Sequence, residues 1–445
     1  MFRQSCGFAW GPMTRILAGL LLCGLLGAPQ SAAGAGLKPP RFLKEVNTVR
    51  TPQEDQWIVI RGATLIDGRG GAPLPDAYVS IRGNRIERTG PSAALKAPAG
   101  AQIVEAGGLT LLPGLIDSHF HLGGEDLPAL FLSHGVTSVR DPGQWIEAYD
   151  GVQRSGRDIP RLFLAGPHLD TPPPAYPADS AIVRDPAEVR QLVNRLADQG
   201  ASSIKVYFRL PLGSVQAAVE AAHSRGLVVT AHLEIVSAVD AIEAGVDGIE
   251  HITSFGTSLL PWREAEKYRQ SVLADNNARS EGRYRVWSEL NFDTPQARKV
   301  IDLVVRQKTF LSATLAVFER RPGDRDATDL QVRGFRKMLE FVGRAGKAGA
   351  RVVVGSHSAV PHAERGWAYQ REMELLVESG LSPMQAIVAA TLEGARFFHA
   401  EDRLGTIEAG KVADLVLIEG DPLSDIRTMR RVRRVMLNGQ WVEAR

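Results

Sequence analysis

Cysteine is nearly missing from this chain of 445 residues. Its two cysteines, Cys6 and Cys23, both lie close to the amino terminus, in a segment that we interpret as a leader. Once that segment is removed, the mature chain has no thiol. A disulfide framework and a cysteine nucleophile are therefore excluded.

Acidic residues are missing from residues 1–35. This segment has two arginines, an apolar run over residues 16–26 and the small-residue pattern "AGA" at 33–35. The arrangement is typical of a secretory signal peptide, so we expect export to the periplasm or the medium. An uncleaved membrane anchor is the alternative, but the apolar run is shorter than the roughly 20 residues that span a bilayer. Met13 is a second candidate start.

Neither sign of charge predominates. The chain has 52 basic and 50 acidic residues, and removal of Arg3 and Arg15 with the leader leaves 50 of each. This balance gives no indication of a nucleic acid or an anionic membrane as a partner. No long apolar run follows the leader, so we expect a soluble mature protein. A small-molecule substrate is the expected partner, and a homo-oligomer is left open.

Short β-strands are predicted at both ends of the chain. From Trp57 to Leu112 the apolar residues alternate with polar ones, with a turn at Gly83-Asn84. Near the other end, "RRVMLNGQWV" contains an Asn-Gly pair, which is typical of a type I′ hairpin. We expect residues 36–112 and 402–445 to form one small β-sandwich domain.

Strand and helix signals alternate in the middle of the chain, over residues 113–401. Eight such alternations predict an α/β fold, a (β/α)8 TIM barrel with parallel strands. The connection over residues 253–295 is long and irregular, so we expect a lid or binding loop there. The eight strand candidates are residues 115–122, 137–143, 161–167, 203–208, 227–233, 248–252, 310–315 and 351–357.

Nitrogen-bearing side chains recur at the carboxyl ends of these strands, where barrel enzymes place their chemistry. The first strand supplies a His-x-His pair, whose side chains point to one side and can hold one ion. The other histidines, at 134, 168, 223 and 399, are interpreted as structural or surface residues. The six residues expected at one barrel mouth are His119, His121, Lys205, His232, His251 and His357.

Four segments together resemble the metal-dependent amidohydrolase superfamily, in particular its imidazolonepropionase and prolidase-like branch. They are "LPGLIDSHFHLGG", "SIKVYF", "VVTAHLE" and "GIEHIT", in that order. The closing stretch "LGTIEAGKVADLVLIEGDPL" fits the same pattern. The resemblance covers nearly all of the mature chain.

The resemblance implies two divalent metal ions, Zn2+ or else Mn2+ or Co2+. His119 and His121 would hold the more buried ion, and His232 and His251 the more exposed one. Lys205 would be carboxylated and bridge the two. A metal lowers the pKa of a bound water from 15.7 to about 7, which gives a hydroxide nucleophile. The implied activity is hydrolysis of a carbon–nitrogen bond in a dipeptide-like or N-acyl compound; an ester or lactone hydrolase is an alternative.

The eighth strand departs from the family pattern, which has an aspartate where this chain has His357. Three interpretations stay open. His357 is a metal ligand, a proton shuttle or both, since an unperturbed imidazole titrates near pH 6.5. Alternatively, His357 only binds metal, and His362 or an acidic residue of the lid shuttles the proton; His362 is also a candidate substrate-binding residue. In the third, catalysis is lost and the chain is a non-catalytic metal-binding or small-molecule-binding protein.

Two further polar residues follow these strands. Asp141 is expected to orient a ligand histidine. Tyr207 lies two residues after Lys205 and is expected on the same face. The resemblance implies that it contacts the substrate or the oxyanion; packing in the barrel mouth is the alternative. The lid carries four aromatic residues and is expected to set specificity: Trp262, Tyr268, Tyr284 and Trp287.

Overall fold

The computed structural model describes residues 50–122, 127–149, 158–357 and 359–442, which belong to one unit, Arg41–Arg445. The predicted signal peptide lies outside the described residues. Within the described ranges, no helix combines the length and the apolar character that a bilayer crossing requires.

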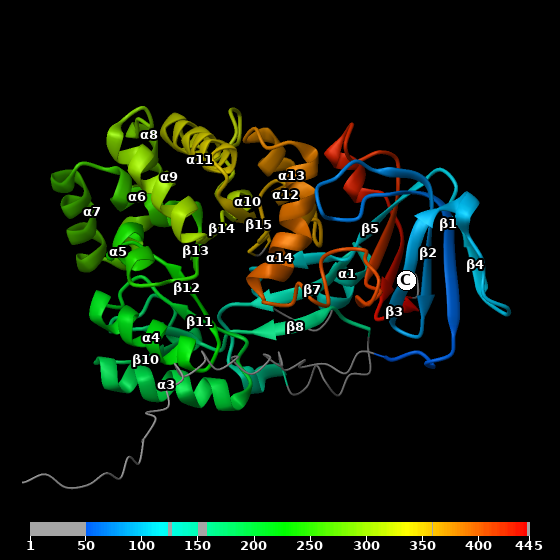
Figure 1. Cartoon of the computed structure of the whole chain (residues 1–445). Coiled ribbons are helices and arrows are strands. Elements are labelled where there is room, and N and C mark those ends of the chain that lie inside the picture. The colour runs from blue at the N-terminus through cyan, green and yellow to red at the C-terminus, as the bar shows by residue number, and fades with distance from the viewer. Residues whose placement is uncertain (1–49, 123–126, 150–157, 358, 443–445) are drawn as a thin grey trace, which may run out of the picture. The chain divides into compact units, whose positions relative to one another are not determined.

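Parallel strands with intervening helices form the barrel in the middle of the chain, as predicted (Figure 1). Each of the eight strand candidates contains a strand, although most are shorter than expected. A short additional strand, β9 (His168–Asp170), follows the third one. The strands are β6 (Leu115–Asp117), β7 (Val136–Asp141), β8 (Arg161–Leu164), β11 (Ser203–Val206), β12 (Val228–His232), β13 (Gly248–Glu250), β14 (Phe310–Ser312) and β15 (Arg351–Val353).

The first and eighth strands meet and so close the barrel. Ser118 N donates to Val354 O at 2.9 Å, and Phe120 forms a parallel bridge with His357. The amide of His357 donates to the carbonyl of His119 at 2.6 Å. The histidines of strands one and eight are therefore tied together through their backbones.

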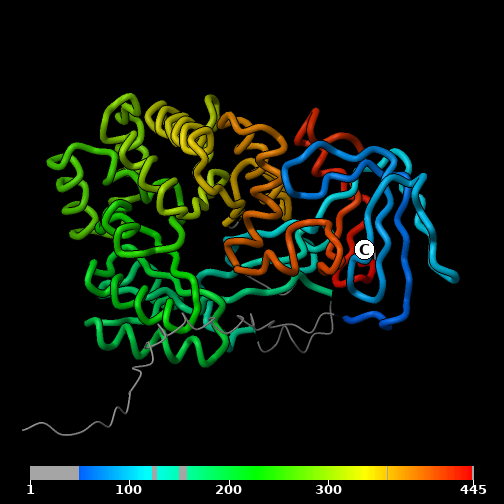
Figure 2. The backbone as a smooth tube through the Cα atoms, viewed as in Figure 1, coloured from blue at the N-terminus to red at the C-terminus, as the bar shows by residue number. Residues whose placement is uncertain are grey.

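Both ends of the described chain contribute to one further sheet, the terminal sheet, again as predicted (Figure 2). The pairing of β5 with β16 joins the two ends. Asn438 and Gly439 have φ angles of 52° and 80°, as the type I′ hairpin requires. The strands are β1 (Trp57–Leu65), β2 (Leu74–Arg82), β3 (Arg85–Pro91), β4 (Gln102–Glu105), β5 (Leu109–Pro113), β16 (Leu415–Glu419), β17 (Val432–Leu437) and β18 (Gln440–Trp441).

A buried ion pair connects the terminal sheet to the barrel. Arg161 opens β8, and its Nε lies 3.0 Å from the Asp414 carboxylate, just before β16. Its guanidinium also reaches Asn438 at 3.1 Å. All three side chains are buried, so this contact is shielded from solvent.

The connection between β13 and β14 is helical, so its predicted irregularity is wrong. Its second long helix, α8, has the sequence "RSEGRYRVWSE", whose polar residues hide the apolar period that signals a helix. The helices are α1 (Leu127–Ser133), α3 (Pro186–Gln199), α4 (Leu212–Ser224), α5 (Ala238–Glu243), α6 (Gly256–Leu259), α7 (Trp262–Ala274), α8 (Arg279–Glu289), α9 (Pro295–Gln307), α10 (Leu315–Phe318), α11 (Asp329–Lys347), α12 (Ala368–Glu378), α13 (Pro383–Ala390) and α14 (Leu392–Phe397).

Candidate metal centre and active site

Imidazole rings from four barrel strands converge at the carboxyl end of the barrel. The ring of His119 lies 4.7 Å from that of His251 and 5.2 Å from that of His357. His121 lies 5.1 Å from His357, and His232 lies 4.3 Å from His251. The structure thus brings all five predicted histidines together, and nitrogens of His119, His251 and His357 lie within 4.8 Å of one another.

Two of these histidines have left-handed backbone conformations. The φ angles are 61° at His251 and 70° at His357, values that are uncommon outside glycine and often mark functional sites. Because residue 251 turns the chain as β13 ends, Glu250 and His251 both contact His119, although consecutive residues of a strand normally point to opposite faces.

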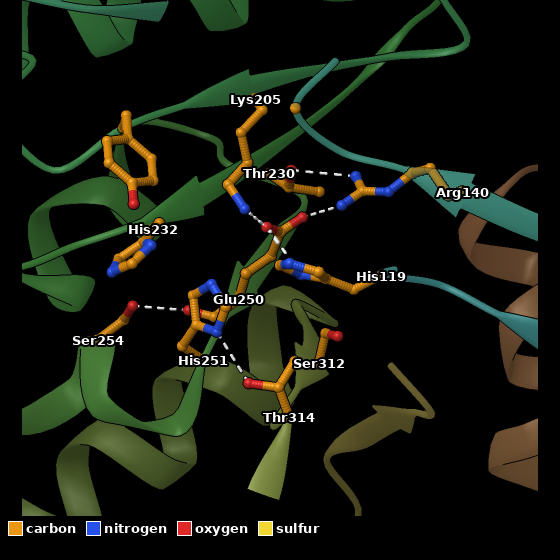
Figure 3. Close-up of polar contacts among 12 residues, drawn as sticks. His119, Arg140, Lys205, Thr230, His232, Glu250, His251, Ser254, Ser312 and Thr314 are labelled. Carbon is orange, nitrogen blue, oxygen red and sulfur yellow. Dashed lines mark hydrogen bonds and ion pairs between the residues drawn. The ribbon is translucent and has the colours of Figure 1, made fainter. Parts of the chain in front are cut away.

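Glu250 is a central residue that sequence reasoning missed. Its carboxylate contacts the Arg140 guanidinium and Lys205 Nζ, and its Oε2 lies 3.1 Å from His119 Nδ1 (Figure 3). Arg140 also donates to Thr230 Oγ1 at 3.2 Å. Glu250 thus joins Lys205 and His119 below the histidine cluster. Consecutive residues of a regular strand point to opposite faces, so the strand pattern alone would not place Glu250 beside His251 in the site.

Hydrogen bonds hold two of these histidine rings in place. Thr314 Oγ1 lies 2.8 Å from His251 Nδ1, which leaves Nε2 of that ring open. This orientation is typical of a histidine that holds a metal. Arg283 on α8 donates to His232 Nε2 at 3.0 Å, so the proton of the neutral ring lies on Nδ1, which is buried without a partner. His232 therefore becomes a metal ligand only when Arg283 releases Nε2.

The donor set fits a divalent transition metal. His119 Nε2 is buried without a hydrogen-bond partner, while Nδ1 faces Glu250. Burial lowers the pKa of His121 to about 4 and holds the pKa of His119, His251 and His357 well below the usual value, so the rings are neutral at pH 7. Neutral imidazole is the form that binds metal. The individual ligand assignments stay predictions.

Lys205 lies beside the cluster, as predicted, with its side chain fully buried. Burial and the nearby Arg140 guanidinium hold its pKa well below the usual value for a lysine. A neutral amine is the form that reacts with carbon dioxide, so this environment is compatible with carboxylation.

A cavity of about 370 Å3 opens above the cluster. His168 was expected to be structural or at the surface, but it lies in this cavity and stacks on Tyr207 at 4.5 Å. The extra strand β9 carries it there, and no strand was predicted at that position. The lining residues are His121, His168, Tyr176, Asp179, Lys205, Tyr207, His232, His251, Arg279, Arg283, Val317, Phe318 and His357.

The other predicted site residues lie at different distances from the cavity and the histidine cluster. Tyr207 lines the cavity as expected. Asp141 Oδ1 lies 3.9 Å from His121 Nδ1, close to the histidine that it was expected to orient. His362 is not among the cavity-lining residues; its Nε2 lies 3.0 Å from Asp324. The backbone of His357 has a φ of 70°, so the chain changes direction there, and His362 follows five residues later, away from the strand end.

The four lid aromatics do not line this cavity. Trp287 and Tyr284 are buried under the lid helices, where they pack in the core, and Trp262 is 72% exposed. The lid reaches the cavity through Arg279 and Arg283 instead. Arg279 and Arg283 are four residues apart, so they share one face of α8. A predicted helix over this stretch would have indicated that the two arginines act at the same place.

The sequence model of the family described as "Amidohydrolase family" matches residues 110–442. An N-acyl-D-aspartate deacylase of Alcaligenes xylosoxydans xylosoxydans is 45% identical over 116 residues, which is 24% of this chain and 22% of that protein. This chain thus spans about a fifth of that deacylase. An uncharacterized protein of Mycobacterium tuberculosis is 26% identical over 377 residues, 77% of this chain and 87% of its own length.

A crystal structure of a Xaa-Pro dipeptidase with bound methionine in its active site superimposes with a TM-score of 0.68. The identity is 22%, and the match covers 87% of this chain and 100% of the other. At this identity the likeness shows a shared fold.

Proposed function

This chain belongs to the amidohydrolase family and is a hydrolase of carbon–nitrogen bonds, and from that premise we propose that it is an exported enzyme that cleaves an amide in an N-acyl or dipeptide-like compound. The observation that carries the proposal is the cluster of neutral histidines at the carboxyl end of the barrel. That edge is where barrel enzymes act.

The histidines at 119, 121, 232, 251 and 357 would hold the metal together with Lys205, which would be carboxylated. The metal, when bound, would supply a Lewis acid that polarises the amide carbonyl and acidifies water. Within the chain, Thr314 and Arg283 keep His251 and His232 in one orientation. Glu250 contacts the buried Arg140 guanidinium and Lys205 Nζ beneath the site.

Metal analysis and turnover together test the proposal. The purified mature protein should contain one to two equivalents of a divalent transition metal, and His119→Ala should lower that content. A panel of N-acyl amino acids, dipeptides, esters and lactones, tested on zinc- or manganese-loaded protein, should show turnover of an amide. Metal binding without turnover of any amide would contradict it and favour a binding protein.

Carboxylation of Lys205 is tested separately. Lys205→Ala should reduce the metal content to one equivalent or less, and a short carboxylic acid such as acetate should restore part of it. A metal-loaded crystal structure with an unmodified lysine still paired to Glu250 would contradict this part of the proposal.

A further inference from the structure

One cation in the cavity forms no ion pair within the described part of the chain. Arg279, the first residue of α8, lines the cavity and is only 8% exposed. Among the described residues, no ion pair involves Arg279, whereas the neighbouring cavity arginine, Arg283, pairs with Glu234 at 2.6 Å. An unpaired charge in a buried position costs several kcal/mol. Its presence here therefore requires an explanation.

Aromatic groups hold the Arg279 side chain in place without neutralising it. Its guanidinium lies over the rings of Phe208 and Tyr176, at 4.6 and 5.3 Å, and Nη1 lies 3.4 Å from Tyr207 Oη. Such cation–π contacts contribute about 0.5–2 kcal/mol and leave the donor hydrogens of the guanidinium largely free. The arrangement orients the arginine toward a ligand.

Two acidic residues of this region, Asp179 and Asp170, form no ion pair with it. Asp179 lines the same cavity, and partial burial together with Asp141 raises the pKa of its carboxyl. Asp170 accepts backbone hydrogen bonds from Thr171 and Arg209 through Oδ1. Burial raises the pKa of the Asp170 carboxyl, and the Arg279 charge lowers it in part, without an ion pair between them. A carboxylate that entered the cavity would thus meet an open guanidinium.

One aromatic ring separates this arginine from the histidine cluster. The Tyr207 ring lies 4.6 Å from that of His232, while its hydroxyl faces Arg279. We infer that Arg279 binds a carboxylate of the substrate, so that the cavity selects acyl amino acids or dipeptides with a free acid group. This inference rests on the proposed amide hydrolysis. It makes Arg279 a specificity-determining residue rather than a metal-site residue.

Matched substrates test this selectivity in the metal-loaded enzyme. N-acetylphenylalanine and N-acetylphenylalaninamide, each as D and L forms, differ in the acid group, and released acetate reports turnover. Charge-assisted hydrogen bonds typically contribute enough that Arg279→Gln should lower kcat/KM for the acid about 10- to 100-fold. The amide substrate should change little, and Arg279→Lys should retain part of the preference.

Arg285→Gln is the matched control, since Arg285 lies on the same helix, is exposed and pairs with Glu281. It should leave both substrates unaffected. An equal loss for the acid and the amide in Arg279→Gln would overturn the inference, since that result indicates a structural role.

A binding measurement separates this inference from the proposed function. Calorimetry with 3-phenylpropionate should show affinity about 10- to 100-fold weaker in Arg279→Gln than in the parent or in Arg285→Gln. The neutral 3-phenylpropionamide should show no such difference. Equal affinity for 3-phenylpropionate in all three proteins would refute carboxylate binding. A difference in affinity without any turnover would uphold it and refute amide hydrolysis.

Discussion

At the scale of single residues, His357 is the position where this chain differs from the family pattern. Its ring stacks on His119 and faces His121 and His251. The location agrees with a ligand or shuttle, the first of the three interpretations made from the sequence. It does not favour His362, which contacts Asp324 outside the cavity lining.

We predict that His357→Ala lowers kcat about 10²- to 10⁴-fold, the usual contribution of general acid–base assistance. His357→Asp should retain more activity than the alanine variant, because a carboxylate can also bind metal and accept a proton. Steady-state kinetics with measured metal content checks this. If His362→Ala loses more activity than His357→Ala, the shuttle assignment is wrong.

The sequence predicted the histidine cluster because each member follows a strand, and strand ends meet at one edge of a barrel. It did not predict His168 or Glu250. His168 depends on an unpredicted short strand, and Glu250 depends on a left-handed residue at His251. Such local departures from regular geometry follow from tertiary contacts, which residue patterns do not encode.

At the scale of elements, close contact between the first and eighth strands positions His119. A Cβ added to Gly355 would lie 2.5 Å from Ser312 Oγ and 2.8 Å from His119 Cβ. We predict that Gly355→Ala displaces His119, lowers the metal content and reduces the free energy of unfolding by about 1–3 kcal/mol, the usual effect of overpacking.

Metal analysis and denaturant unfolding check this prediction. Gly213→Ala, in α4, is the matched control, because an added Cβ there meets no atom within 4 Å. It should leave the metal content unchanged and should not lower the free energy of unfolding, since alanine at a compatible helical position stabilises by about 0.4–1 kcal/mol. A full metal complement in Gly355→Ala would show that the strands adjust without moving His119.

Glu372 of α12 holds the segment that follows β14 and leads to the cavity. It is fully buried and accepts hydrogen bonds from the amides of Leu315 and Ala316, next to Thr314. Burial raises the pKa of its carboxyl from 4.5 to about 8. The folded state therefore keeps a proton that the unfolded state loses above pH 4.5, and the stabilisation from this group falls as pH rises toward 8.

We predict that Glu372→Gln is less stable than the parent at pH 5, and that the difference shrinks by an amount on the order of a few kcal/mol by pH 8. Urea unfolding of the parent and the variant at several pH values measures the difference between their free energies of unfolding. A difference that is constant with pH would mean that Glu372 has the same pKa in both states.

The lid shows why its helices were harder to predict from the sequence than the barrel strands. The barrel strands are apolar runs that end in polar residues, and their pattern was readable. Helix α8 buries Arg279 and Tyr284 as well as Trp287, so both of its faces carry polar groups and the helical period is masked. The sequence predicted a lid from the length of this connection, but it did not predict that the lid is helical.

At the scale of the whole molecule, Arg161 and Asp414 couple barrel and terminal sheet. We predict that Arg161→Met lowers the free energy of unfolding by about 3–5 kcal/mol, because it leaves a buried carboxylate without its partner. Asp414→Asn in the same chain should recover part of the loss. Denaturant unfolding of both variants measures the coupling.

Arg433→Met is the control for that series, since Arg433 and its partner Glu419 are exposed and such pairs contribute little. Its effect should stay within about 0.5 kcal/mol. If Arg161→Met changes stability no more than Arg433→Met, the two parts are held together by other contacts.

The pairing of β5 with β16 also has a consequence for the order of folding. Pro113 lies opposite Leu415, so a strand made before the barrel is paired with one made after it. During synthesis the β5 edge stays open until the ribosome has released the last part of the chain, and open strand edges promote aggregation. A contact so distant in sequence forms slowly. The terminal sheet is thus expected to be the late step of folding, and the period before it closes is when a chaperone would matter most.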